Sequence, residues 1–177
     1  DHALHANLLR LYAAPHLGHF WFSHKLWRDI VDAQNSVTLV HQHGIWTNLS
    51  VYTNHFRKQT GRPVVLAPHG SLEPVALSRS SYKKRLALWG YEAENLDKAD
   101  CLHALSHKEA HEFRQYGLKQ PIAMVPNGIS SAWLRSAGTG EDALQQFGIP
   151  NDRRLMLFLS RLHPIKGLPL LLRALHN

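Results

Sequence analysis

Short apolar runs alternate along the chain with longer segments of helical spacing. The β-prone runs predict strands at 37–40, 64–67, 101–105, 122–125 and 155–159. Between them, apolar residues at steps of three and four predict helices at 20–33, 49–60, 80–98, 106–116 and 141–147, and from 168 onward. This alternation is typical of an α/β fold, in which helices cover both faces of a parallel sheet.

Local signals mark the ends of several predicted elements. Gly61 and Pro63 end the second helix, and Gly117 ends the helix that begins near residue 106. Ser106 can cap that helix, and Glu109 three residues later completes a capping-box pattern. The helix–strand alternation is therefore supported by turn chemistry as well as by hydrophobic spacing.

Polar residues follow the predicted strands. These positions are His43-Gly44, His69-Gly70, Asn127-Gly128 and Arg161. Ligands of parallel α/β sheets bind beyond the carboxyl ends of the strands, so the pattern predicts a site at that edge. His69 can donate a hydrogen bond to a hydroxyl or accept a proton near neutral pH. The alternative is an ordinary loop histidine, because the chain has 14 histidines.

A second candidate is an anion site near the end of the chain. Arg161 follows the last predicted strand, and Lys166-Gly167 opens the last predicted helix. A helix N-terminus offers backbone N–H groups and partial positive charge, which suit phosphate, and Gly167 allows close backbone approach. The alternative is a pair of solvated cations beside a turn.

Metal and polyanion sites are weaker predictions. The spacing of His41 and His43 puts both rings on one face of a strand, and His107 and His111 lie four apart on a helix. No carboxylate stands at a diagnostic spacing, so we expect no metal site. Residues 79–85 combine a tyrosine with four cations. They suit phosphates of nucleic acid or lipid, or they form a solvated helix face.

Composition adds little that is specific. The 177 residues carry a net charge of +7, which suits nucleic acid, an anionic membrane surface or phosphorylated small molecules. A single cysteine, Cys101, excludes an internal disulfide and fits a reducing compartment. No apolar run approaches the length of a membrane-spanning helix. The five tryptophans are scattered, and we expect most of them in the core or at interfaces.

Five segments taken in order resemble a known family. They read LVHQHGIW, VVLAPHGSLEPVAL, ALSHKEAHEFRQYG, IAMVPNGI and LMLFLSRLHPIKGLPLLLRAL. Their order and spacing over about residues 20–177 resemble the retaining GT-B glycosyltransferases of family 4, in particular bacterial enzymes of surface-polysaccharide assembly. The resemblance implies transfer of a sugar from a nucleotide-sugar donor to a saccharide or lipid-linked acceptor with retention.

The resemblance also implies an architecture of two Rossmann-like domains facing a cleft. An acceptor-side domain would cover residues 1–128, a linker 129–151, and the start of a donor-binding domain 152–177. It further implies no metal or cofactor, no nucleic-acid partner, and a cytoplasmic location where the inner membrane face can be contacted.

The resemblance also implies roles for the residues that match the family's motifs. Arg161, Lys166 and Gly167 would hold the donor diphosphate, and His69 would contact the transferring sugar as the catalytic candidate. An acceptor-side loop would contain His43, Gly44 and Trp46, and the chain would cross between domains at Asn127 and Gly128.

Two parts of the family pattern are missing. The family's first strand with its glycine-rich loop should precede residue 1, and its paired glutamates should follow residue 177. We therefore expect a fragment with little activity alone, prone to self-association through an exposed sheet edge. Two other functions remain open: another GT-B enzyme such as a sugar-nucleotide epimerase, and a non-catalytic anion-binding module.

Overall fold

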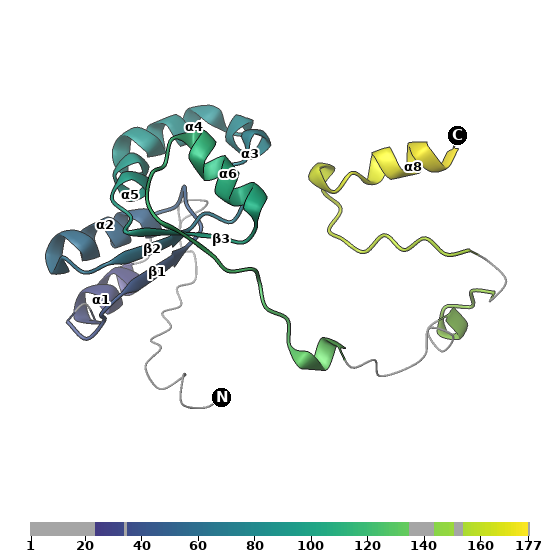
Figure 1. Ribbon diagram of the computed structural model, residues 1–177, viewed down its shortest axis with the longest axis horizontal. Coiled ribbons are helices and arrows are strands. Elements are labelled where there is room, and N and C mark those ends of the chain that lie inside the picture. The colour runs from purple at the N-terminus through teal and green to yellow at the C-terminus, as the bar shows by residue number, and fades with distance from the viewer. Residues whose placement is uncertain (1–23, 34, 135–143, 151–153, 177) are drawn as a thin grey trace. The chain divides into compact units, whose positions relative to one another are not determined.

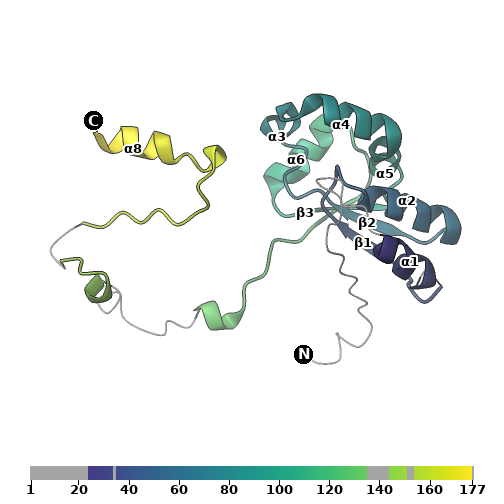
Figure 2. The ribbon, with the colours of Figure 1, turned by 180° about the vertical axis from the view of Figure 1, so that it is seen from behind.

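The computed structural model describes residues 24–33, 35–134, 144–150 and 154–176 (Figure 1). The chain divides into two compact units, Asp1–Gly128 and Ile129–Asn177, each of which is considered by itself. Figure 2 shows the same elements from behind.

The first unit is built on a four-stranded parallel sheet in the order β1-β2-β3-β4. The strands are β1 Val40–His43, β2 Val64–Ala67, β3 Cys101–Ala104 and β4 Ile122–Met124. Each strand lies beside the next one in the chain, with helical segments in between. The sheet confirms the predicted α/β fold class.

The first strand lies three residues later than predicted. The apolar run suggested 37–40, but pairing with β2 begins at Val40, whose N–H donates to the carbonyl of Pro63 at 3.1 Å. The carbonyl of Val37 instead accepts a hydrogen bond from the Arg62 guanidinium. A strand extends as far as its neighbour supplies backbone partners, so register rather than hydropathy set this boundary.

Helical segments connect the strands. They are α1 His24–Ala33, α2 Leu49–Thr60, α3 Pro74–Ser78, α4 Ser81–Ala87, the π-helical turn η3 Leu88–Glu92, α5 Ala93–Asp97 and α6 His107–Tyr116. The helix predicted at 80–98 is therefore present but interrupted by η3. The predicted ends are confirmed, because Gly61 and Gly117 are left-handed C-caps and the Ser106 side chain accepts the N–H of Glu109.

The core lies on one face of the sheet. Leu66 and Leu102 from the strands pack with Leu96 of α5 and Phe113 of α6, and all four are buried. Figure 1 accordingly shows α4, α5 and α6 on one side of the strands.

The opposite face is less covered. It carries Val65 and Cys101, which are half-buried, and His41 and Ala123, which are exposed. The expectation of helices over both faces therefore does not hold for the described residues.

The second unit contains less regular structure. Its described helical elements are η4 Ser131–Leu134, a turn at 144–146, η5 Pro164–Lys166 and α8 Leu168–His176. The strand predicted at 155–159 is wrong, because no second strand among the described residues of this unit supplies backbone partners. Parts of the helices predicted at 20–33 and 141–147 lie outside the described residues. No described helix has the length and apolar character needed to cross a membrane.

Candidate functional site

The turn after β2 places His69 at the carboxyl edge of the sheet. The N–H of Ser71 donates to the carbonyl of Pro68 at 3.3 Å, and the two residues between them, His69 and Gly70, have φ values of 53° and 71°. Positive φ is natural for glycine but costs of order 1 kcal/mol for histidine, so surrounding contacts must hold His69 there.

Four histidines from two strands and this turn lie together. The histidine cluster consists of His41, His43, His69 and His103. The Nδ1 of His43 lies 2.7 Å from the Nε2 of His69, and the Nε2 of His41 lies 3.1 Å from the Nδ1 of His103. Ring centroids are 4.3 to 6.5 Å apart. The prediction that His41 and His43 share one face is confirmed.

The strand register explains this convergence. His43 pairs with Ala67 across β1 and β2, and His103 follows the last pair of β2 with β3, Leu66 with Leu102. His43, Ala67 and His103 therefore stand side by side on one face. The centroids of the His43 and His103 rings are 6.4 Å apart, with the rings edge to face.

A carbonyl sets the tautomers of one histidine pair. The Nε2 of His103 lies 2.7 Å from the carbonyl of Val125, and a carbonyl only accepts, so this nitrogen carries a proton. In the neutral ring Nδ1 then accepts from the Nε2–H of His41. The cluster can thus pass a proton between rings and offer nitrogen donors and acceptors to hydroxyl groups.

Partial burial, with a smaller contribution from mutual repulsion, keeps part of the cluster neutral. Partial burial, followed by the neighbouring His43, His103 and His69, lowers the pKa of His41 to about 4. Burial, then His69 and His103, also lowers the pKa of His43. At neutral pH these two rings are uncharged, so they suit hydrogen bonding to polar hydroxyls better than attraction of anions.

Trp46 is joined to the same turn. Its indole Nε1–H donates to the carbonyl of Ser71 at 3.2 Å, and the ammonium of Lys84 lies 5.8 Å from its ring centroid. Its φ is 67°, an uncommon value for a bulky residue, and its backbone N–H donates to the Glu92 carboxylate at 2.7 Å. The predicted acceptor-side loop is therefore fixed against the His69 turn.

Glu92 is a fully buried carboxylate that the sequence reasoning missed. Its oxygens also accept from the Ser50 hydroxyl at 2.9 and 3.0 Å and from the Asn95 amide at 2.8 Å. Burial raises the pKa of Glu92, while hydrogen bonds from Asn95, Trp46 and Ser50 oppose the rise. The sequence offered no signal for this role, because Glu92 stands in a predicted amphipathic helix where acids are common.

Glu109 likewise accepts backbone N–H groups, here in the turn that carries His69. One carboxylate oxygen accepts the N–H of Gly70 at 2.6 Å, and the other accepts the N–H of Leu105 at 2.8 Å. The capping-box pattern identified Glu109 as part of a helix start but gave no sign of the contact with Gly70. This contact ties α6 to the conformation of His69.

The remaining predicted residues belong to the end of the first unit and to the second unit. Asn127 and Gly128 are exposed at the end of the first unit, and Arg161 and Lys166 are exposed in the second unit. Gly167 has a φ of 70°, and its N–H donates to the carbonyl of Pro164 at 3.1 Å. Pro169, the second residue of α8, has no N–H, so this helix start offers fewer donors to an anion than the sequence suggested.

Two further observations concern a cavity outside the histidine cluster and the capacity to bind a metal ion. A cavity of about 580 Å³ lies between α5 and the segment before β4, lined in part by Leu96, Tyr116 and Lys119, at the amino ends of the strands and away from the histidines. Among the described residues, no three His, Cys, Asp or Glu side chains are arranged to hold a metal ion.

Comparisons with known proteins agree on one family. Residues 2–128 match the family described as the Glycosyl transferase 4-like domain. A D-inositol 3-phosphate glycosyltransferase of Streptomyces avermitilis is 31% identical over 141 residues, which cover 77% of this chain and 30% of that protein. The protein of the same name from Nocardiopsis dassonvillei is 33% identical over 85 residues, covering 47% and 20%. The chain thus spans less than a third of either relative.

One solved structure has the same fold. The crystal structure of Anabaena Alr3699/HepE in complex with UDP-glucose superposes with a TM-score of 0.62 at 23% identity, over 85% of this chain and 39% of that one.

Proposed function

Since the chain belongs to the Glycosyl transferase 4-like family, we propose that it acts in the transfer of a sugar from a nucleotide-sugar donor to a hydroxyl acceptor, with retention. The observation that carries the proposal is the family match over residues 2–128, which contains the whole histidine cluster and both carboxylates that hold its surroundings. The structural neighbour solved with UDP-glucose supports the donor class.

The roles in this proposal are those that the family resemblance implies for the matching residues. His69, held by the turn that Glu109 fixes, hydrogen-bonds the transferring sugar, while His43, Gly44 and Trp46 border the acceptor. Arg161 and Lys166 offset the charge of the donor diphosphate as it leaves, with Gly167 shaping the turn before α8. Asn127 and Gly128 form the passage between the two units. The proposal requires no metal ion or cofactor.

Two classes of acceptor are compatible with the proposal. The resemblance favoured a saccharide or lipid-linked acceptor in surface-polysaccharide assembly, at the cytoplasmic face of the membrane. Both relatives, however, are named for D-inositol 3-phosphate, which favours a phosphorylated polyol as the second candidate. Neutral imidazoles at the sheet edge suit the hydroxyl groups of either class.

Donor binding tests the proposal directly. We would titrate the chain with UDP-, GDP- and ADP-glucose and follow backbone amide resonances, which detect weak as well as tight binding. We expect one nucleotide sugar to shift resonances near Lys166, and Lys166→Ala to weaken binding about tenfold or more, the loss typical of one charge-assisted hydrogen bond.

Lys119→Ala is the matched control, because Lys119 is an exposed lysine of the first unit, outside the proposed site. We expect little turnover by this chain alone, given the share of its relatives that it spans. Absence of shifts with every nucleotide sugar, or equal losses in both variants, would contradict the donor role.

A further inference from the structure

The helical segment α4–η3 exposes a row of large apolar side chains. Tyr82, Leu86 and Trp89 are 65%, 67% and 90% exposed. They follow one another at steps of four and three, which places them along one side of the helix. We refer to these three residues as the α4 ridge. Figure 1 shows α4 on the side of the helices away from the strands, so the ridge is not part of the core.

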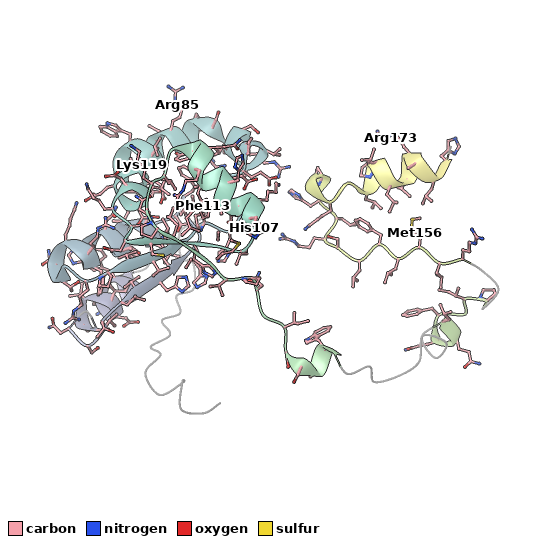
Figure 3. The ribbon with its side chains drawn as sticks, in the orientation of Figure 1. Arg85, His107, Phe113, Lys119, Met156 and Arg173 are labelled. Atoms are coloured by element: carbon pink, nitrogen blue, oxygen red, sulfur yellow. The ribbon has the colours of Figure 1, made fainter. Side chains whose placement is uncertain are left out.

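Cations accompany the ridge and acids are missing from it. Lys83 and Arg85 are exposed on α4, and the sequence has no Asp or Glu between Glu73 and Glu92. The ammonium of Lys83 lies 5.8 Å from the Tyr82 ring centroid. Arg85 borders a shallow hollow together with Tyr82 and Leu86, and Figure 3 shows it pointing outward from α4.

Lys84, also on α4, by contrast contacts neighbouring segments of the protein. Its ammonium donates to the carbonyl of Ala76 and lies near the Trp46 ring, so it braces α4 against α3 and the loop after β1. Lys83 and Arg85, one residue to either side, are turned outward instead. The two outward cations therefore lie on either side of the apolar row and do not interrupt it.

The chemistry of this surface matches an anionic bilayer. Tyrosine and tryptophan are the side chains that favour the headgroup level, where the ring meets acyl chains and the polar end meets water. Cations beside an apolar row extend to lipid phosphates, as in helices that lie in the membrane surface. Three side chains on a single helix present much less area than a stable protein interface requires, which favours a deformable lipid surface over a protein partner.

We propose that the α4 ridge docks the protein on an anionic phospholipid bilayer, with Tyr82, Leu86 and Trp89 entering the headgroup region and Lys83 and Arg85 contacting lipid phosphates. The docking does not depend on the transferase proposal, because none of these residues belongs to the histidine cluster or to the proposed donor contacts. It gives the chain a way to reach lipid-linked molecules at the bilayer surface.

The test is co-sedimentation of the 177-residue chain with vesicles. Vesicles of phosphatidylcholine containing phosphatidylglycerol are compared with vesicles of phosphatidylcholine alone. We expect binding to the anionic vesicles, reduced by high salt. We also expect Trp89→Ala and the double variant Lys83→Gln/Arg85→Gln each to weaken that binding about tenfold.

Matched controls separate the ridge from general charge and exposed tryptophan. Trp133, which is 84% exposed in the second unit, is replaced in Trp133→Ala, and Lys119 in Lys119→Gln. Both controls should bind as the unchanged chain does. Because all replaced side chains are exposed, the variants should retain the far-ultraviolet circular dichroism of the parent.

Three results would overturn the proposal. The first is the absence of vesicle binding, and the second is binding that Trp89→Ala and Trp133→Ala weaken equally. The third is self-association that Trp89→Ala abolishes without any vesicle binding, since the occupant of the ridge would then be a second copy of the chain.

Discussion

At the scale of single residues, two buried carboxylates hold unusual backbone conformations at the carboxyl edge of the sheet. Trp46 and His69 have positive φ, which other contacts must stabilise. Glu92 accepts the N–H of Trp46, and Glu109 accepts the N–H of Gly70, directly after His69. These two positioning residues therefore fix the loops that carry the site.

The histidine cluster makes stability depend on pH. The pKa of His41 is about 4 in the folded protein, against an ordinary value of 6.5, so between these values the unfolded chain binds more protons. The free energy of unfolding is therefore retained above pH 6.5 and falls as the pH drops from 6.5 toward 4. His41→Asn removes this group and should lose about 2–4 °C less in Tm between pH 7 and pH 5 than the parent does.

Thermal melts followed by circular dichroism measure this difference. His111→Asn is the control, because His111 is exposed on α6 and lies outside the cluster. If His41→Asn and the parent lose the same Tm on acidification, the lowered pKa of His41 does not govern the acid response.

At the scale of elements, local sequence signals determined where the helices end. Long-range packing determined which side chains are exposed. The predicted caps of α2 and α6 are present. Most tryptophans were expected in the core or at interfaces, and two of them, Trp89 and Trp133, are 90% and 84% exposed. Helical spacing identifies a face, but only the packed structure shows whether that face meets the core or solvent.

Ser106→Ala tests the cap of α6. The Ser106 hydroxyl accepts the N–H of Glu109 at 3.3 Å, and its loss should lower the free energy of unfolding by about 1 kcal/mol. Ser81→Ala, at the first residue of α4, is the control and should change stability by less than about 0.5 kcal/mol. Urea unfolding gives both values, and equal effects of the two variants would mean that the cap does not stabilise α6.

At the scale of the whole molecule, the principal core is formed by the first unit alone. Its buried members run from Ile45 to Leu118 in the sequence. The apolar run at 155–159, by contrast, exposes Leu157 and Leu159 by 82% and 88%. Burial of apolar side chains is the main source of stability, so the first unit should determine the unfolding transition.

Two side-chain truncations, one in each unit, test whether the first unit supplies most of the stability. Phe113→Ala removes a fully buried ring between α6 and the sheet and should cost about 3–5 kcal/mol. Leu157→Ala should change stability by less than about 0.5 kcal/mol, because its side chain is largely exposed. Comparable losses in urea unfolding would show that residues 155–159 stabilise the chain as much as the core does.

The sequence by itself determined the features that arise from neighbouring residues. Runs such as 64–67 predicted strands, Ser106 and Gly117 predicted the ends of α6, and the alternation of elements predicted a parallel α/β sheet. It also placed His43 and His69 at the carboxyl ends of strands, although His43 proved to be the last residue of β1 rather than the first residue after it. Periodicity, capping and turn chemistry act over a few residues, so they can be read without knowledge of the fold.

Only the tertiary structure decided which distant residues meet. His41 and His103 are 62 positions apart, and their contact depends on the register of β1, β2 and β3. The roles of Glu92 and Glu109 depend on loops 46 and 39 positions away. The start of β1 and the loss of the strand predicted at 155–159 have the same cause. A strand exists only where another strand supplies its backbone partners. That pairing joins residues far apart in the sequence, so neighbouring residues do not predict it.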